Sequence, residues 1–299
     1  MQKYSIFNLI KNAFSGHQNW DLAWKDPTPK KEYDVVIIGG GGHGLATAYY
    51  LAKEHNITNV AIIEKGWIGG GNVGRNTTII RSNYMHDDNA LFSEFGMDLW
   101  RKMSQDLNYN VMFSPRGIIN LAHSDAQMNV YARRGNSMRL NGIDAVLLNR
   151  EQVKEIIPMA DFSDNVRFPI FGGLMQPSAG TARHDAVAWG YARQADSMGV
   201  DIIQNCEVTG FDVAGGKING VRTSRGDIKV KKIGLCVAGS TNILAEKLNM
   251  TLPIETHLLQ ACVSEPVKPI LDRVVTFGAG HFYISQSDKG EMVMGGDLD

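Results

Sequence analysis

Apolar and polar positions recur along the chain with two periods, and together they predict a mixed α/β protein. Residues 33–38 and 59–63 are short, β-branched apolar runs, as expected of strands buried on both faces of a parallel sheet. Between them, residues 43–54 carry apolar side chains at helical spacing. The pattern predicts one strand–helix–strand unit whose helix begins directly after a run of glycines.

The same periods predict further elements over the rest of the chain. Helices are expected over residues 87–104, 126–139, 185–198 and 239–249. Strands are expected over residues 117–121, 145–148, 201–203, 208–211, 218–223 and 232–238, and several antiparallel strands are expected from residue 255 onward, including 256–264 and 291–295. From residue 185 the chain again shows a helix followed by apolar strands, as in its first unit. This indicates that a mixed region is inserted after that unit.

Composition limits the class of protein. The 299 residues, 43% hydrophobic and 20% charged, are typical of a globular protein long enough for two domains. The 30 basic and 31 acidic side chains give a net charge of -1 without a long block of one sign. This balance offers no electrostatic case for a nucleic-acid partner.

Cysteines and apolar runs bear on the compartment. Cys206, Cys236 and Cys262 are odd in number and far apart, so they predict neither disulfides nor a metal site, and reducing cytoplasm is expected. No apolar run reaches the roughly 18 residues of a membrane-spanning helix, and residues 1–24 lack the features of a signal peptide. Residues 4–14 predict an amphipathic helix that packs against the body or a partner subunit.

A glycine-rich loop follows the first predicted strand. Gly39, Gly41 and Gly44 form G-x-G-x-x-G, in which the first glycine permits a tight turn, the second admits a pyrophosphate and the third allows close packing of helix on strand. The backbone amides at the head of the helix, including those of Gly42 and His43, would hold the anion. The alternative is a simple tight turn, but the flanking strand and helix favour dinucleotide binding.

Glu64 ends the second predicted strand about 20 residues after the last motif glycine, where a carboxylate accepts hydrogen bonds from the adenosine ribose. The acid disfavours a cofactor with a 2′-phosphate. The neighbouring Lys65 is a further cofactor-binding candidate. These residues do not distinguish FAD from NAD.

A second glycine-rich segment, residues 66–74, favours FAD because a flavin needs further backbone and polar contacts beyond its diphosphate. The polar candidates for these contacts are Asn72, Arg75, Asn76, Thr77 and Thr78.

Four segments resemble one family specifically: YDVVIIGGGGHGLATAYYLA, AIIEKGWIGGGNVGRNTTIIRSNY, GTARHDAVAWGYAR and VDIIQNCEVTGF. They are similar to the β subunits of heterotetrameric sarcosine oxidases, within the D-amino-acid oxidase superfamily. The similarity runs from about Pro27 to the last residue. It implies an α/β fold with a Rossmann-like FAD-binding domain of the GR2/DAO type and a mixed, mainly antiparallel-sheet substrate domain.

The resemblance also implies a domain division. Residues 1–30 are expected to form an N-terminal extension, residues 31–110 and 180–255 a discontinuous FAD-binding domain, and residues 111–179 and 256–299 a substrate domain. Because β subunits of the family continue for on the order of a hundred residues more, the substrate domain is expected to be incomplete at its C-terminus.

Two cofactors follow from the resemblance: non-covalent FAD, and FMN attached through a histidine that matches His184. Without the family, His184 is typical of a solvent-facing histidine at a helix start, with Asp185 as a cap. An imidazole nitrogen is a competent nucleophile toward the flavin 8-methyl carbon, and Arg183 would offset negative charge. Val208 matches the position of a segment over the adenine, and Gly239 is a further cofactor-binding candidate.

Arg81 is the candidate for gripping the substrate carboxylate. A guanidinium makes paired, charge-assisted contacts with a carboxylate, and the superfamily places an arginine there. A surface salt bridge is the alternative role. Tyr283 is the second catalytic candidate, because the matching strand supplies active-site side chains in related oxidases.

The activity implied is oxidative demethylation of sarcosine by FAD to an imine, with electrons passing to FMN and then to O2 to form H2O2. The family also implies α, γ and δ partner subunits and tetrahydrofolate on a partner as acceptor of the one-carbon unit. Two other hypotheses remain open: a single-subunit FAD amino-acid oxidase or dehydrogenase, and a non-catalytic flavin-binding or assembly module.

Overall fold

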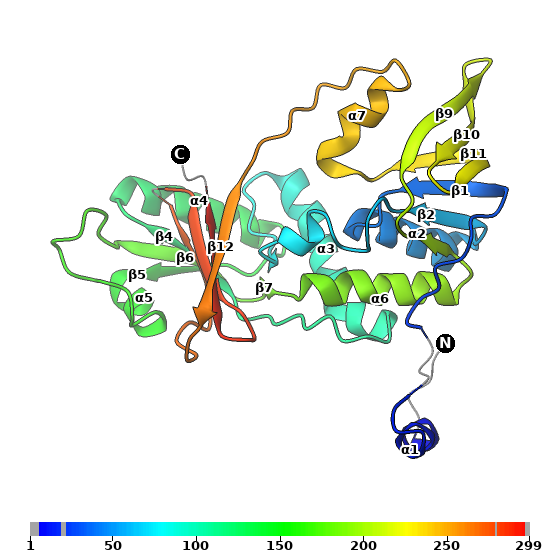
Figure 1. The fold of residues 1–299 in the computed structure, drawn as a ribbon. Helices are drawn as coiled ribbons and strands as arrows, with labels where there is room; N and C mark the ends of the chain where they lie inside the picture. The colour runs from blue at the N-terminus through cyan, green and yellow to red at the C-terminus, as the bar shows by residue number, and fades with distance from the viewer. Residues whose placement is uncertain (1–5, 19–21, 279, 297–299) are drawn as a thin grey trace. The chain divides into compact units, whose positions relative to one another are not determined.

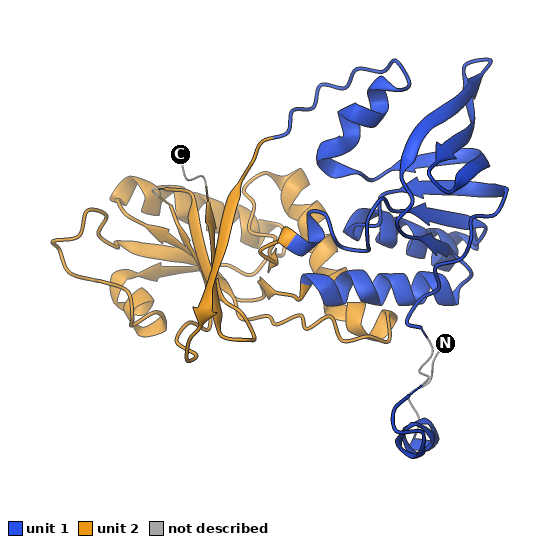
Figure 2. Cartoon of the chain, viewed as in Figure 1, with its two compact units in different colours: residues 1–74, 184–256 blue, residues 75–183, 257–299 orange. Residues whose placement is uncertain are grey.

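The computed structural model describes residues 6–18, 22–278 and 280–296 (Figure 1). The chain forms two compact units, and each is built from two separate segments (Figure 2). Unit 1 comprises residues 1–74 and 184–256, and unit 2 comprises residues 75–183 and 257–299.

Unit 1 holds a six-stranded sheet with the order β8-β2-β1-β11-β10-β9. Four strands are parallel: β1 (Glu32–Ile38), β2 (Val60–Ile63), β8 (Asp201–Ile203) and β11 (Gly226–Leu235). An antiparallel hairpin, β9 (Val208–Ala214) and β10 (Lys217–Thr223), extends the sheet beyond β11. This arrangement is the Rossmann-like part of the predicted α/β fold.

Helices cover both faces of this sheet, which explains why β1 and β2 are continuously apolar. On one face lie α2 (Gly42–His55) and α6 (His184–Ser197), whose Tyr49 and Tyr191 rings meet edge to face with centroids 5.3 Å apart. On the other face, Leu244 of α7 (Thr241–Glu246) joins the buried cluster of Val36.

Unit 2 holds a seven-stranded sheet with the order β12-β15-β14-β13-β4-β6-β5. Every neighbouring pair is antiparallel except β4 with β13. The strands are β4 (Ile118–Ala122), β5 (Val146–Asn149), β6 (Gly172–Gln176), β12 (Gln260–Pro266), β13 (Val274–Phe277), β14 (Phe282–Gln286) and β15 (Glu291–Gly296). The predicted mixed, mainly antiparallel sheet is therefore confirmed.

Among the described residues of unit 2 lie the helices α3 (Asp87–Asp106), α4 (Asp125–Leu140) and α5 (Arg150–Ile156). Met138 of α4 lies in a buried cluster with Leu174, and Val153 of α5 lies in another with Ile119. A two-stranded ribbon of β3 (Ile79–Ile80) and β7 (Gly180–Thr181) completes the unit.

Residues 75–110 and 180–183, expected in the FAD-binding domain, group with unit 2 by their contacts. Strand β3 pairs with β7, and the backbone amide of Ser82 donates to the side chain of Gln176 on β6, about 100 residues further along the chain. The sequence carries no local signal for these long-range bonds.

Several boundaries also differ from the sequence expectation. Strand β11 begins at Gly226, not residue 232; β12 begins at Gln260, not residue 256; and α7 ends at Glu246, not residue 249. Elements that the apolar pattern did not predict are β3, α5, β6 and β7, whereas β13 and β14 lie where several strands were expected without stated bounds.

Helix α1 (Ile6–Phe14) forms where an amphipathic helix was expected, although Tyr4 lies outside the described residues. None of its residues is buried; Phe7 is 78% and Phe14 90% exposed. No helix in the described part of the chain is long and apolar enough to cross a membrane.

Candidate functional site

The glycine loop after β1 has the geometry that its motif predicts. Gly39 has φ of +109°, and a Cβ there would overlap the carbonyl oxygen of Cys236. A Cβ on Gly44 would overlap the carbonyl oxygen of Gly39 and approach Ile37 Cγ2 to 3.3 Å. Both positions therefore require glycine, one for its turn and one for the close approach of α2 to β1.

The head of α2 presents amide donors. The first helical bond of this turn runs from Leu45 N to Gly41 O at 3.0 Å, and the N-cap residue Gly41 has no side chain to cap the helix. In the described part of the chain the amides of Gly42, His43 and Gly44 thus lack helical partners. The His43 ring is exposed. Unpaired amides and a helix dipole fit the diphosphate of FAD.

Glu64 follows β2 and binds the loop from the side. Its Oε2 accepts a hydrogen bond from Gly40 N at 2.7 Å, and its Oε1 accepts one from Gly66 N at 2.9 Å. Each carboxylate oxygen has a second lone pair, so the group also retains acceptor capacity for a ribose hydroxyl. Glu64 therefore links the two glycine-rich segments, and its contact with a ribose stays a prediction.

The second glycine-rich segment lies against the first. Gly69 N donates to Gly40 O at 3.2 Å, and Val73 Cγ2 lies 3.6 Å from where a Cβ on Gly42 would be. Asn72 and Lys65 are exposed and make no polar contact within the described residues. Their roles as flavin contacts stay predictions.

The end of β11 also reaches this edge of the sheet. Cys236 N donates to Ile38 O at 2.8 Å, so the turn that contains Gly239 (η2, Ala238–Ser240) follows beside the Gly39 loop. Cys206 N donates to Glu64 O at 2.9 Å, and Val208 begins β9 two residues later. Unit 1 thus gathers the predicted residues at the carboxyl ends of parallel strands, where such folds bind dinucleotides.

His184 is the first residue of α6 and is half-buried. Its ring makes no hydrogen bond within the described residues. Asp185 accepts a bond from Ala186 N at 2.7 Å in the first turn.

In unit 2, the segment before Arg81 is strained. Thr78 has φ of +65°, an unfavourable conformation for a β-branched residue. Its amide donates to Asn76 Oδ1 at 2.6 Å, and its carbonyl accepts a bond from Ala182 N at 3.2 Å. Strand β3 follows, and Arg81 is the first residue after the two that pair with β7.

The remaining flavin candidates in unit 2 are Arg75, Thr77 and Arg183. Arg75 is exposed, Thr77 is half-buried, and Arg183 Nη1 lies 3.6 Å from Asp288 Oδ2. Their roles as flavin contacts stay predictions.

The Arg81 guanidinium is half-buried and carries unpaired donors. Its Nη1 donates to Asn83 Oδ1 at 2.7 Å, and its Cζ lies 4.6 Å from the centre of the Tyr84 ring. Among the described residues no carboxylate pairs with it, so the alternative role in a surface ion pair is not observed. A guanidinium has five N–H donors, which leaves most of them available to an anion.

Tyr283 lies in a polar row across the large sheet. Asn120, Thr276, Tyr283 and Gly295 face one another on β4, β13, β14 and β15. A Cβ on Gly295 would overlap the Tyr283 hydroxyl, so the phenol lies over that glycine. Asn83 Nδ2 donates to Asn120 Oδ1 at 2.7 Å, and Asn120 Nδ2 donates to Thr276 Oγ1. A hydrogen-bonded chain therefore runs from Arg81 to the residue opposite Tyr283.

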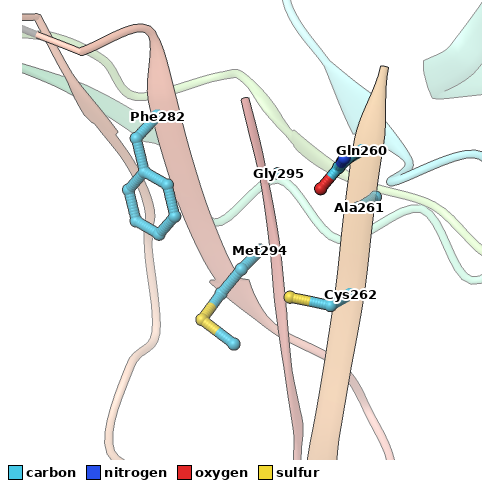
Figure 3. Close-up of a pocket in the computed structure, with 6 residues that line it drawn as sticks. All are labelled: Gln260, Ala261, Cys262, Phe282, Met294 and Gly295. Atoms are coloured by element: carbon cyan, nitrogen blue, oxygen red, sulfur yellow. The ribbon is translucent and has the colours of Figure 1, made fainter. Parts of the chain in front are cut away.

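A small pocket of about 110 Å³ opens at the same strands (Figure 3). Its lining includes Cys262, Phe282 and Met294, which lie on the opposite face of the sheet from Tyr283 because alternate side chains point to opposite faces. The lining holds no charged group, so this pocket does not explain recognition of a carboxylate.

Sequence reasoning missed the residues that surround Arg81: Asn83, Tyr84, Asn120, Arg134 and Thr276. They come from four elements or loops and meet only in the folded chain. The one local signal is the polar pair Ser82-Asn83 directly after Arg81, and the structure buries both of these side chains.

Comparison with known families places the molecule in a class. The FAD-dependent oxidoreductase (DAO) family model matches residues 34–299. Together with the glycine loop, the uncapped helix and Glu64, this match defines an FAD-dependent oxidoreductase.

More specific relatives exist. The chain is 61% identical over 297 residues to the sarcosine oxidase subunit beta of Rhizobium meliloti, covering 99% of this chain and 71% of the relative. It is 52% identical to the subunit beta of Rhodobacter capsulatus, with coverage of 100% and 72%. The chain belongs to the family of sarcosine oxidase β subunits.

Solved structures support the fold. The L-proline dehydrogenase from P. horikoshii superposes with a TM-score of 0.84 at 26% identity, over 90% of this chain and 71% of that one. The glycine oxidase from Geobacillus kaustophilus gives a TM-score of 0.76 at 19% identity, over 90% and 74%. The latter likeness concerns the fold alone.

Proposed function

We propose that this chain is a flavin-bearing subunit that oxidises sarcosine at its N-methyl C–N bond. The single observation that carries the substrate assignment is Arg81, a half-buried guanidinium without a carboxylate partner among the described residues. The names of relatives at 52–61% identity support sarcosine as the amino acid.

Within this proposal the residues bind and orient the substrate. Bound FAD supplies the two-electron acceptor. Arg81 holds the carboxylate, and the Tyr283 phenol offers a polar contact on the same face of the sheet as Thr276. No side chain need act as a base, because a neutral amine delivers hydride equivalents directly.

The proposed overall reaction converts sarcosine, O2 and H2O to glycine, formaldehyde and H2O2. With tetrahydrofolate on a partner subunit, the same one-carbon unit becomes 5,10-methylenetetrahydrofolate and one water is released. We place the enzyme in the cytoplasm.

Testing this function requires two measurements on one preparation. The purified protein should take up FAD, seen as quenching of flavin fluorescence, and should release H2O2 on addition of sarcosine. A protein that binds FAD but releases no peroxide would support the non-catalytic alternative. A protein that takes up no FAD would contradict the proposal.

We further propose that FMN attaches to His184. Support comes from an imidazole without a hydrogen-bond partner among the described residues, at the start of α6, next to the cationic Arg183. Denatured wild-type protein should retain a flavin mass adduct on the His184 peptide, and His184→Ala should not. Oxidation of sarcosine without any such adduct would favour the single-subunit FAD oxidase.

We also propose α, γ and δ partner subunits; the names of the relatives, each a subunit beta, support an assembly with other subunits. Helix α1 lies outside the family match, which begins at residue 34, yet the Rhodobacter capsulatus alignment spans all 299 residues. Its apolar residues are exposed, including Phe7 and Phe14. We propose that α1 contacts another subunit. Phe7→Ser with Phe14→Ser should release the chain from co-expressed partners, whereas Asn12→Ser should not.

A further inference from the structure

Arg134 is a second arginine beside Arg81. It lies on α4, and its Nε donates to the backbone carbonyl of Asn83 at 2.6 Å while its Nη2 donates to the same oxygen. Burial and the positive charge of Arg81 lower the pKa of Arg134. No carboxylate pairs with Arg134 within the described residues. The fold therefore holds two cations in one cluster without an acid to neutralise them.

Asn83 connects the two arginines and is 1% exposed. Its Oδ1 accepts from Arg81, its carbonyl accepts from Arg134, and its Nδ2 donates to Asn120. Because a guanidinium only donates, the amide oxygen of Asn83 must face Arg81, and its amide nitrogen must face Asn120. The direction of every bond from Arg81 to Thr276 is thereby fixed.

Two like charges in a partly buried cluster disfavour each other, and a buried cation without a partner is costly. An anion bound at Arg81 would relieve both costs. The donors that remain free on Arg81 are the ones such an anion would meet.

We propose that Asn83 and Arg134 are positioning residues for carboxylate recognition: Arg134 holds the Asn83 backbone, Asn83 aims the Arg81 guanidinium, and the paired positive charge attracts the substrate carboxylate. The inference deepens the proposed function, since sarcosine would be the carboxylate bound. It does not depend on turnover, because any small carboxylate should feel the same pair of charges.

The test compares Arg134→Met with Arg133→Met in FAD-loaded protein. Arg133 is the neighbouring, exposed arginine, so its variant changes net charge equally without touching Asn83. Binding is read from the change in flavin absorbance as acetate, or its neutral analogue acetamide, is added. Sarcosine oxidation supplies KM and kcat.

For Arg134→Met we expect acetate binding weakened about tenfold, the sarcosine KM raised about tenfold and kcat changed by less than about twofold. Acetamide binding should stay the same in every variant, because it carries no charge. If Arg134→Met does not fold, Arg134→Lys tests the inference in its place. This variant keeps the charge but loses the forked contact with the Asn83 carbonyl, so acetate should bind about threefold more weakly.

Unchanged acetate binding in the Arg134 variant, or an equal loss in Arg133→Met, would overturn the inference. So would a wild-type protein that binds FAD but not acetate. If acetate binding depends on Arg134 as expected but the wild-type protein leaves sarcosine unoxidised, the proposed function alone is overturned.

Discussion

The carboxylate of Glu64 accepts a hydrogen bond of 2.7 Å from the amide of Gly40, the residue after the first motif glycine. The acid thus shapes the phosphate loop before any sugar is bound. Replacing Glu64 by Ala leaves the amides of Gly40 and Gly66 without an acceptor, which costs about 1–3 kcal/mol for each buried donor. We expect FAD affinity to fall at least about tenfold, measured by flavin fluorescence quenching.

Glu54→Ala is the matched control, because this acid is exposed at the end of α2. It should leave FAD affinity unchanged. Equal losses in both variants would mean that net charge, rather than the bonds to Gly40 and Gly66, determines binding.

The close approach of α2 to the Gly39 loop predicts that Gly44→Ala will be severely destabilising. The added Cβ would overlap the carbonyl oxygen of Gly39, which is backbone and cannot rotate away. We expect a loss of at least about 2 kcal/mol in the free energy of unfolding and no detectable FAD binding. Gly96→Ala on α3 meets open space and should be neutral or stabilise by up to about 1 kcal/mol. Urea unfolding of both variants checks the contrast.

Substrate binding should depend on Arg81 more than the chemical step does. Arg81→Met removes the charge but keeps most of the side-chain packing against Tyr84. We expect the sarcosine KM to rise about 100-fold or more, since a charge-assisted contact with a carboxylate is worth about 3 kcal/mol. FAD affinity should change little. A variant with unaltered KM would exclude Arg81 from carboxylate binding.

The stability of unit 2 should depend on pH through His123. Burial lowers the pKa of His123 below its usual 6.5, and Nε2 is buried without a partner in the described part of the chain. The unfolded chain therefore takes up a proton near pH 6.5 while the folded unit resists it, so stability is full above this pH and falls as the pH drops. His123→Phe keeps the ring contact with Phe277, 4.2 Å between centroids, and should flatten the fall in Tm between about pH 7 and pH 5. The exposed His55→Gln should leave the wild-type profile intact.

The first unit was largely predictable because its signals are local. Strand, turn, helix and acid lie within residues 33–64, and each glycine of the motif has a backbone reason that the structure displays at Gly39 and Gly44. The sequence predicts the start of β11 six residues too late. The first half of this strand alternates lysine with Ile228 and Val230, which is the two-residue period of a strand with one exposed face. The continuous apolar run was the stronger signal there.

The second unit was harder to predict because its pairing is long-range. Strand β13 lies parallel to β4 across more than 150 residues of chain. The buried side chains of Asn83 and Gln176 bond to Asn120 and Ser82, which are distant from them in sequence. Arg81 could be found from its type and place, but Arg134 could not, since its role depends on a backbone carbonyl 51 residues earlier.

The position of β1 between β2 and β11 has a consequence for biosynthesis. Val36 pairs with Ala61 on one side and with Ile233 on the other, so one edge of the central strand has no neighbour until nearly 200 further residues have left the ribosome. During that interval an apolar strand edge is available for wrong pairing. Nascent chains of this protein should therefore need a chaperone that shields exposed strands, and slower translation before residue 226 should lower the yield of folded product.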